Sequence, residues 1–164
     1  MNDLQVRWMI RRDMPEVVDI EASAFEFPWS EDEFIRALRQ RNCIGMVAEH
    51  NTTIVGYMIY ELHKTSIWLS NIAVHKDYRR KGIGVRLIAK LVAKLNPQRR
   101  RNIWIGIRES NLAGQLFFRD CGFRATSILK GFHDAEETDE DAYRMVLTAR
   151  GFETCRRVAQ SAST

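Results

Sequence analysis

Hydrophobic residues recur along the chain with two different periods, and these predict both helices and strands. The clearest helical pattern covers residues 83–95, where Leu87, Ile88 and Leu91 share one face and basic residues occupy the other. Pro97 stops this helix, because proline cannot donate the next hydrogen bond. The segment before it is a basic turn, preceded by an apolar run. Residues 67–95 therefore predict a strand, a turn and a helix in direct succession.

Capping residues predict three more helices. A helix start is marked by a short polar side chain that can accept a backbone hydrogen bond, by an early proline, or by a glutamate three residues later. Pro28 separates the first two of these helices, since the residue before a proline avoids helical geometry. The last one ends at Gly122. The expected starts are Asp13 with Pro15, Ser30 with Glu33, and Ser110 or Asn111.

Shorter apolar runs predict the strands. Two of them flank the polar segment 50–53 and should form an antiparallel hairpin. The run 103–107 follows a strand and a helix, so we expect it to lie parallel to residues 67–74 and to be buried on both faces. The elements together indicate a mixed α/β fold. The expected strands are residues 6–10, 44–49, 54–62, 67–74, 103–107, 126–129 and 143–147.

The composition fits one globular domain. The chain has 164 residues, of which 45% are hydrophobic, and this suffices for a single full core. No apolar run approaches the roughly 18 residues that span a membrane, and the N-terminus lacks a signal-peptide pattern. We therefore expect a cytoplasmic protein that does not bind membranes. The 3 cysteines lack metal-ligand spacing, so neither a metal site nor a disulfide framework is expected.

Charge is distributed unevenly. The formal net charge is +4, with basic residues concentrated over 79–94 and 99–101 and acidic ones over 134–141. This predicts an anionic ligand on one side and a basic partner on the other. The acidic segment is either a solvated loop or a guide for the basic part of a protein substrate. No motif indicates direct nucleic-acid binding, and the oligomeric state stays open.

The turn before helix 83–95 suits a phosphate group. Gly82 and Gly84 have no Cβ, so a ligand can approach the backbone closely. Arg79, Arg80 and Lys81 add positive charge where a helix start offers unpaired N–H groups. On spacing alone, an ordinary glycine-containing connection with a solvated basic face explains these residues equally well.

Arg79-x-x-Gly82-x-Gly84 resembles the Q/R-x-x-G-x-G/A motif of the GNAT superfamily of N-acetyltransferases. The resemblance extends over about residues 5–147. The segment Phe27-Pro28-Trp29-Ser30 resembles one that is typical of ribosomal-protein-alanine N-acetyltransferases (the RimI type). Three other segments resemble signatures of the protein N-terminal acetyltransferase branch: Asn71-Ile72-Ala73-Val74, Arg108-Glu109-Ser110-Asn111 and Cys121-Gly122-Phe123.

The resemblance implies a GNAT fold. Its central sheet would have six or seven mostly antiparallel strands, splayed between the fourth and fifth, and about four flanking helices. We expect the acetyltransferase domain over residues 1–147. Residues 148–164 would form a C-terminal tail, either frayed or a loosely docked helix.

The resemblance also implies acetyl-CoA as the cosubstrate and a protein N-terminus as the acceptor. Phe27 and Trp29 serve equally well as a hydrophobic staple and core anchor. The expected substrate-binding residues are Glu26, Phe27, Trp29, Tyr60 and Tyr143. The expected acetyl-CoA-binding residues are Ile72, Ala73, Val74, Arg79, Arg80, Lys81, Gly82, Ile83, Gly84, Val85, Asn111 and Phe118.

The acid–base pair typical of RimI-type enzymes is absent. The position of their glutamate base is occupied here by Gly106, and the position of their tyrosine acid is occupied by Phe118. The candidates to replace this acid–base pair are Tyr143, His133 and Glu109. Tyr143 resembles the tyrosine of an E-D-A-Y-x-M segment in related enzymes. A relay through water is the other option, because an α-amine with a pKa near 8 is roughly one-tenth neutral at pH 7 and needs little help from a base.

We expect transfer of acetyl to a protein N-terminal α-amine, with a ribosomal protein as the substrate class. Two alternatives stay open. One is acetylation of a small-molecule amine. The other is an acetyl-CoA-binding module that has lost catalysis, since the cofactor motif is intact while the acid–base pair is not.

Overall fold

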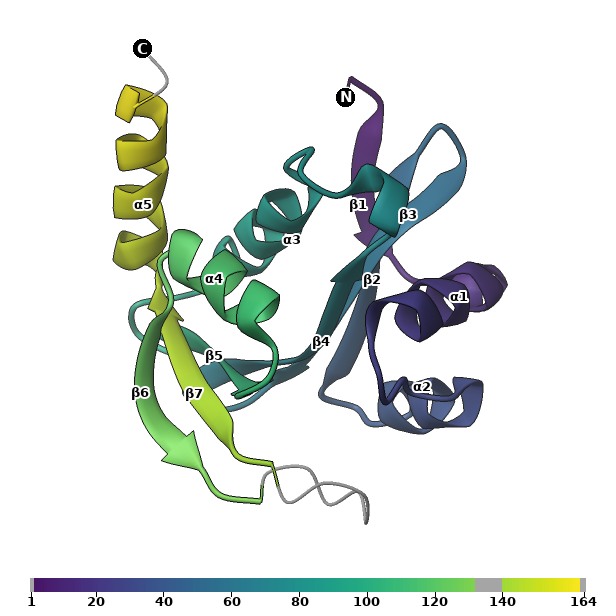
Figure 1. Ribbon diagram of the computed structural model, residues 1–164, viewed down its shortest axis with the longest axis horizontal. Helices are drawn as coiled ribbons and strands as arrows, with labels where there is room; N and C mark the ends of the chain where they lie inside the picture. The colour runs from purple at the N-terminus through teal and green to yellow at the C-terminus, as the bar shows by residue number, and fades with distance from the viewer. Residues whose placement is uncertain (1, 132–139, 163–164) are drawn as a thin grey trace. The chain divides into compact units, whose positions relative to one another are not determined.

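The computed structural model describes residues 2–131 and 140–162, with side chains described as far as residue 157. The chain divides into two compact units (Figure 1). Unit 1 comprises Met1–His63 and Leu69–Leu91, and unit 2 comprises Lys64–Trp68 and Val92–Thr164.

Unit 1 contains an antiparallel meander with helices packed on it. β1 pairs with β2 and β2 pairs with β3, both antiparallel. Asn51 and Thr52 form the turn between β2 and β3 with positive φ angles of 48° and 66°, which confirms the predicted hairpin. The elements are β1 (Leu4–Trp8), η1 (Arg11–Asp13), α1 (Met14–Ala24), α2 (Glu31–Leu38), β2 (Cys43–His50), β3 (Thr53–Leu62), most of β4 (Ser66–Val74), η2 (Lys76–Tyr78) and α3 (Ile83–Val92).

Unit 2 begins with the first residues of β4. These pair with β5 in parallel over three residue pairs, from Ser66↔Asn102 to Trp68↔Trp104. β7 pairs antiparallel with both β5 and β6. The remaining elements are β5 (Asn102–Arg108), α4 (Leu112–Asp120), β6 (Arg124–Leu129), β7 (Ala142–Thr148) and α5 (Ala149–Ala162).

The strands pair in the order β1-β2-β3-β4-β5-β7-β6, which makes seven. Only the β4–β5 pair is parallel among those whose register is described. Its short register agrees with the predicted separation of these two strands. The mixed α/β fold and the mostly antiparallel sheet are thereby confirmed, with five α-helices in the described chain rather than about four.

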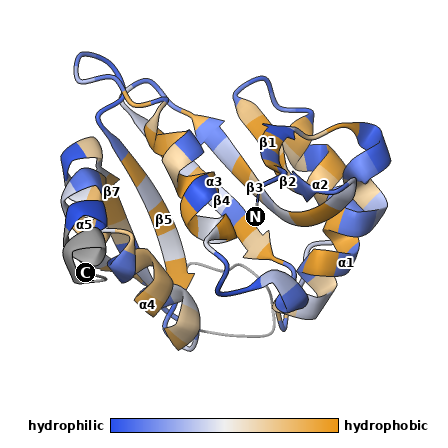
Figure 2. Cartoon of the chain, turned by 90° about the horizontal axis from the view of Figure 1, so that it is seen from above, coloured by the Kyte–Doolittle hydropathy of each residue, from blue (hydrophilic) through white to orange (hydrophobic). Residues whose placement is uncertain are grey.

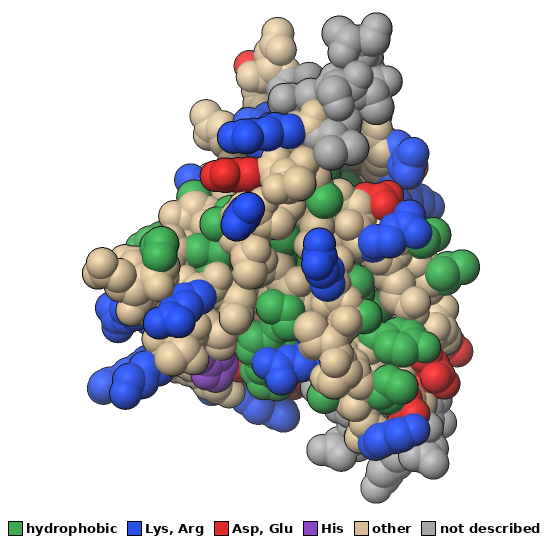
Figure 3. All heavy atoms as spheres, turned by 90° about the vertical axis from the view of Figure 1, so that its left-hand side faces the viewer, with side chains coloured by type: hydrophobic (Ala, Val, Ile, Leu, Met, Phe, Trp, Pro, Cys, Tyr) green, Lys and Arg blue, Asp and Glu red, His purple; other side chains and the backbone are tan. Residues whose placement is uncertain are grey.

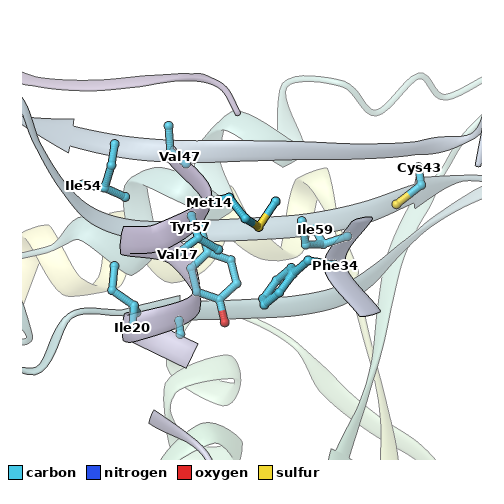
Figure 4. Packing of buried hydrophobic residues seen from close by; sticks show 10 residues of the cluster. Met14, Val17, Ile20, Phe34, Cys43, Val47, Ile54, Tyr57 and Ile59 are labelled. Atoms are coloured by element: carbon cyan, nitrogen blue, oxygen red, sulfur yellow. The ribbon is translucent and has the colours of Figure 1, made fainter. Parts of the chain in front are cut away.

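The core of unit 1 lies between α1, α2 and the meander. Figure 4 shows Tyr57 of β3 among aliphatic side chains of α1 and beside Phe34 of α2, with ring centroids 5.6 Å apart. Helix α3 carries hydrophobic and hydrophilic residues in alternation (Figure 2) and packs near Gly56 of β3. A Cβ at Gly56 would lie 3.4 Å from Ile83 and 3.5 Å from Leu87, which is ordinary van der Waals contact.

The core of unit 2 is built around aromatic rings. Phe118 of α4 is 3% exposed and lies edge to face with Phe117 and Phe123. Gly122 has a φ of +101°, and a Cβ there would lie 2.7 Å from the Gly151 carbonyl oxygen. A side chain at this position would therefore collide with the start of α5.

Basic side chains are spread over the face shown in Figure 3.

Two local expectations are corrected, and of the two alternatives for the C-terminal tail the helix is found. The helix predicted over 83–95 ends at Val92. β5 is not buried on both faces, because Trp104 and Gly106 are half-buried between buried isoleucines. Residues 149–162 of the predicted tail form a helix, and Phe152 in it is buried.

The predicted cap at Asp13 is corrected as well. Asp13 stands before α1, but its side chain makes no capping bond to that helix. Its carboxylate instead accepts bonds from the Ile10 N–H at 2.8 Å and from Arg7 at 2.7 and 2.8 Å. Asp13 therefore stabilises the preceding 3-10 turn, and it ties this turn to β1. No helix in the described parts of the chain is long and apolar enough to cross a membrane.

Candidate functional site

The connection from β4 to α3 in unit 1 is exposed and basic. Arg79, Arg80 and Lys81 are exposed, and α3 begins directly after Gly82. The first helical hydrogen bond runs from the Arg86 N–H to the Gly82 carbonyl at 3.1 Å. The N–H groups ahead of Arg86 in the first turn of α3 thus lack helical acceptors and can bind an anion.

The backbone turns sharply where a ligand would approach. Arg80 and Gly82 have positive φ angles of 64° and 80°, the region that favours glycine. A Cβ built at Gly82 would meet no atom within 4 Å. The space in front of this glycine is therefore open, and the residues fit a pyrophosphate group.

Side chains hold the loop in place. The Arg79 Nε–H donates to the Val74 carbonyl at 3.1 Å, which links the loop to the end of β4. Tyr78 packs edge to face against His75, with centroids 5.6 Å apart, and the Lys81 ammonium lies 5.2 Å from the Tyr78 ring. The loop is thus fixed by ring contacts and one backbone acceptor while its guanidinium and ammonium groups stay exposed.

The end of β4 lies next to the predicted cofactor loop. Ile72 and Val74 are half-buried, whereas Ala73 is 8% exposed. A Cβ at Gly56 would lie 3.1 Å from the Ala73 carbonyl oxygen, so β3 closely supports β4 here. Ile83 is buried, and Gly84 and Val85 are half-buried in the first turn of α3. All the predicted cofactor residues from 72 to 85 therefore belong to one continuous segment of unit 1.

A buried polar cluster lies behind this segment. Glu21 of α1 is 2% exposed, and Asn71 of β4 is 8% exposed. The Glu21 carboxylate accepts hydrogen bonds from the Tyr57 hydroxyl, from Asn71 Nδ2 at 3.0 Å and from the Trp29 N–H at 2.9 Å. Burial, followed by the neighbouring Glu21 carboxylate, raises the pKa of Tyr57 far above its usual value. Tyr57 therefore stays protonated as a donor.

This cluster fixes the segment between α1 and α2, which includes three predicted substrate-binding residues. Glu26 is exposed, and Phe27 and Trp29 are half-buried. Trp29 packs on Phe34 with ring centroids 5.2 Å apart. The predicted capping box of Ser30 and Glu33 is confirmed, with bonds of 3.2 and 2.7 Å.

Tyr60 is the fourth predicted substrate residue in unit 1, and it is fully buried. Its hydroxyl lies 3.8 Å from the Met46 sulfur, and burial raises its pKa to about 12. Tyr143 lies in unit 2, half-buried on β7 and directly opposite Ile107.

Two further predicted cofactor residues belong to α4 in unit 2. The Asn111 side chain accepts a bond from the Gly114 N–H at 2.9 Å, so it caps this helix. Phe118 is a core residue between Phe117 and Phe123. Neither the Phe118 ring nor the Gly106 hydrogen atom can exchange a proton.

The position at Gly106 is bordered by an aromatic and cationic stack. Gly106 lies directly opposite Arg144 on β7. The Arg144 guanidinium lies 4.6 Å from the Trp104 ring centroid, and Trp104 stacks on Trp68 at 3.8 Å. All three side chains are half-buried. We call Trp68, Trp104 and Arg144 the tryptophan–arginine stack.

Glu109 and His133 are the remaining catalytic candidates. Glu109 is exposed, and its N–H donates to the Asp141 carbonyl at 3.0 Å. His133 and most of the acidic segment lie outside the described residues. Glu140 accepts from the Ser110 N–H at 2.7 Å and pairs with Arg108 at 3.4 Å. Bonding from Ser110, followed by Arg108, lowers the pKa of Glu140.

Sequence reasoning missed the roles of Glu21, Tyr57 and Arg144. Glu21 follows Val17 by four residues and so lies on the apolar face of α1, which is a usable signal of a buried carboxylate. For Arg144 no such signal exists, because its partner Trp104 lies on another strand. Among the described residues, no group of three or more histidine, cysteine, aspartate or glutamate side chains could hold a metal ion.

Comparison with known proteins identifies the family. The model of the acetyltransferase (GNAT) family matches residues 14–123. The [ribosomal protein bS18]-alanine N-acetyltransferase of Escherichia coli K12 is 30% identical over 135 residues, which cover 82% of this chain and 90% of that protein. The match therefore spans nearly all of that relative.

Solved structures agree with this match. The crystal structure of the E. coli ribosomal-protein-S18-alanine N-acetyltransferase has a TM-score of 0.76 at 27% identity, covering 89% of this chain and 94% of that one. Arabidopsis thaliana NAA60 in complex with acetyl-CoA has a TM-score of 0.73 at 15% identity, covering 88% and 98%, and thus shares the fold. The chain belongs to the GNAT family of acetyltransferases.

Proposed function

We propose that the chain transfers an acetyl group from acetyl-CoA to the N-terminal α-amine of a protein, with a ribosomal protein as the substrate class. The observation that carries this proposal is the open, basic loop at the start of α3, in a chain that is 30% identical to the bS18-alanine enzyme. The fold alone would not distinguish among amine acceptors.

Acetyl-CoA supplies the acetyl group as an activated thioester. The residues proposed to hold its pyrophosphate are the N–H groups at the start of α3, supported by Arg79, Arg80 and Lys81. The backbone of Ile72, Ala73 and Val74 is proposed to bind the pantetheine arm and the thioester carbonyl. Asn111 is a further proposed cofactor residue. Ordering the donor in this way lowers the entropic part of the barrier.

The proposed reaction places little demand on a base. A model α-amine has a pKa of about 7.7–8.0, whereas lysine has one of about 10.4. At pH 7 the α-amine is thus roughly one-tenth neutral, while lysine is less than one-thousandth neutral. Tyr143, Glu109 and His133 are the proposed proton-handling side chains, and water is the alternative acceptor. We expect kcat/KM to rise with pH through the pKa of the substrate amine.

A second candidate is an acetyl-CoA-binding module without catalysis. The observation that favours it is the pair Gly106 and Phe118, neither of which can exchange a proton. In that case the loop before α3 would bind acetyl-CoA, and the complex would act as a sensor or interaction partner.

Incubation with acetyl-CoA and peptides of varied N-termini tests the proposal. Mass spectrometry should locate the acetyl group on the α-amine, and a peptide with a blocked N-terminus and a free lysine serves as the control. Acetyl-CoA binding without acetylation of any amine would favour the module. Acetylation of metabolite amines with all peptides untouched would instead favour a small-molecule acetyltransferase.

A further inference from the structure

The tryptophan–arginine stack in unit 2 contains a cation, Arg144, that forms no ion pair with any carboxylate of the described residues. The register places Gly106 directly opposite Arg144, and directly opposed residues point to the same face of a sheet. The Arg144 guanidinium lies over Trp104, at 4.6 Å, which in turn stacks on Trp68. Because Gly106 has no side chain, β5 leaves this part of the face to Arg144.

One hydrogen-bond donor of Arg144 is unsatisfied among the described residues. Its buried Nε has no hydrogen-bond partner among the described residues, and no described carboxylate forms a salt bridge with it. A donor that is withdrawn from water and has no acceptor lowers the free energy of unfolding. Stacking on an aromatic ring uses the flat face of a guanidinium group. The N–H groups at the edge of the guanidinium can then bind a planar anion. The described part of the chain thus holds this cation in a fixed position without a neutralising carboxylate.

The neighbouring arginine shows the contrast. Arg108 lies on the same strand, two residues beyond Gly106, and it pairs with Glu140 at 3.4 Å. Asp141, the other described acidic residue at this end of β7, pairs with Lys130 at 2.8 Å. The two described carboxylates nearest to Arg144 in sequence are therefore already engaged with other cations.

We infer that the Arg144 guanidinium, held on Trp104 beside Gly106, is a subsite for a carboxylate group of the amine substrate. An arginine fork binds a carboxylate through two parallel, charge-assisted bonds. This inference rests on the proposed function, because position 106 is where RimI-type enzymes place the residue that approaches the substrate amine. The carboxylate belongs either to an acidic side chain next to a peptide N-terminus or to the α-carboxylate of a free amino acid.

Matched peptides test the subsite in the full chain. Three peptides would differ only at the second residue, which is Glu, Gln or Arg after an N-terminal alanine. We expect kcat/KM to be about tenfold higher for Glu than for Gln, and lowest for Arg, since a charge-assisted pair gained near the amine contributes at least this much. Free alanine compared with alanine amide distinguishes the amino-acid source from the peptide source.

Variants attribute the preference to Arg144. In Arg144→Leu the Glu and Gln peptides should react at equal rates. Gly106→Glu would place a carboxylate directly across from Arg144 and should remove the preference by occupying the guanidinium. Arg124→Leu removes an exposed arginine from β6 in the same unit and should leave the preference intact.

The outcomes separate this inference from the proposed function. Equal rates for Glu and Gln peptides in wild type, or a preference that persists in Arg144→Leu, would overturn the subsite and leave the acetyltransferase proposal standing. If no amine is acetylated, calorimetry with CoA and the same peptides decides the matter. Tighter binding of the Glu peptide that is lost in Arg144→Leu supports the subsite, whereas equal binding refutes it.

Discussion

Each unit of the molecule has a charged side chain with buried polar atoms, but the hydrogen bonding of these atoms differs between the two. In unit 1 the Glu21 carboxylate is 2% exposed and accepts hydrogen bonds from three donors on three different segments. In unit 2 the Arg144 guanidinium lies over a tryptophan ring, and its buried Nε has no partner among the described residues.

The difference separates a structural charge from one that is available to a ligand. A buried charge is retained when every lone pair or proton is matched, and its loss leaves the partners unsatisfied. A charge with unmatched hydrogen-bonding groups contributes little to stability and is free to bind something else. Glu21 therefore positions the segment that contains Trp29, whereas Arg144 is suited to recognition.

The largest expected effect tests the structural side of this comparison. Glu21→Ala removes the acceptor of the Trp29 N–H, the Tyr57 hydroxyl and the Asn71 amide. We expect the free energy of unfolding in urea to fall by about 4 kcal/mol, since each buried unsatisfied donor costs roughly 1–3 kcal/mol. Glu16→Ala is the control on the same helix, because Glu16 accepts one hydrogen bond among the described residues, from the Ile54 N–H. A loss in Glu21→Ala no greater than the control loss would contradict the structural role.

Two arginines test the same contrast between a paired and an unpaired group for positive charges. Arg7 pairs with both Asp13 and Glu49, so Arg7→Leu leaves Asp13 buried without a cation and should cost about 2–3 kcal/mol of unfolding free energy. Arg144→Leu removes an unsatisfied donor and should change stability by less than about 1 kcal/mol. Thermal and urea denaturation would measure both. Equal losses would mean that Arg144 is also a structural residue.

Two glycines, one in each unit, test the cofactor loop. Gly82 and Gly131 both have positive φ, and a Cβ at either meets no atom within 4 Å. Gly82→Val should weaken acetyl-CoA binding at least tenfold, or about 1.4 kcal/mol, because the side chain strains the loop and fills the open space. Gly131→Val imposes the same backbone strain in unit 2 and should leave calorimetric affinity unchanged. Arg79→Ala should weaken binding as well, since it removes a charge and the bond to Val74.

The smallest expected effect is a pH dependence of stability. Burial tends to raise the pKa of Asp13, but hydrogen bonds from Arg7 and the Ile10 N–H outweigh it, so the pKa is lowered on balance. A lowered folded-state pKa gives stability that is present above the unfolded value of about 3.9 and is lost as pH falls through the folded value. Urea denaturation between pH 6 and pH 3 should show this loss in wild type at about 1 kcal/mol or less. Arg7→Leu should show a smaller loss.

Local rules in the sequence determined most elements of the fold. The capping box at Ser30, the hairpin around Asn51 and the start of α3 after Gly82 all depend on residues within a few positions of one another. The family motif over Arg79 to Gly84 is local for the same reason. Boundaries that depend on packing, such as the end of α3 at Val92, were predicted less well.

Only the tertiary structure decided how the charged side chains are used. Asp13 looked like a helix cap, but Arg7 on β1 competes for its carboxylate. Glu21 meets Asn71 across 50 positions of sequence, and Arg144 meets Trp104 only because β5 and β7 are neighbours. A charge is defined by what surrounds it, and the surroundings of these residues come from distant strands. The sequence by itself therefore determined the family and the basic loop that is proposed to bind acetyl-CoA, whereas strand pairing decided which charge is structural and which is left for the proposed ligand.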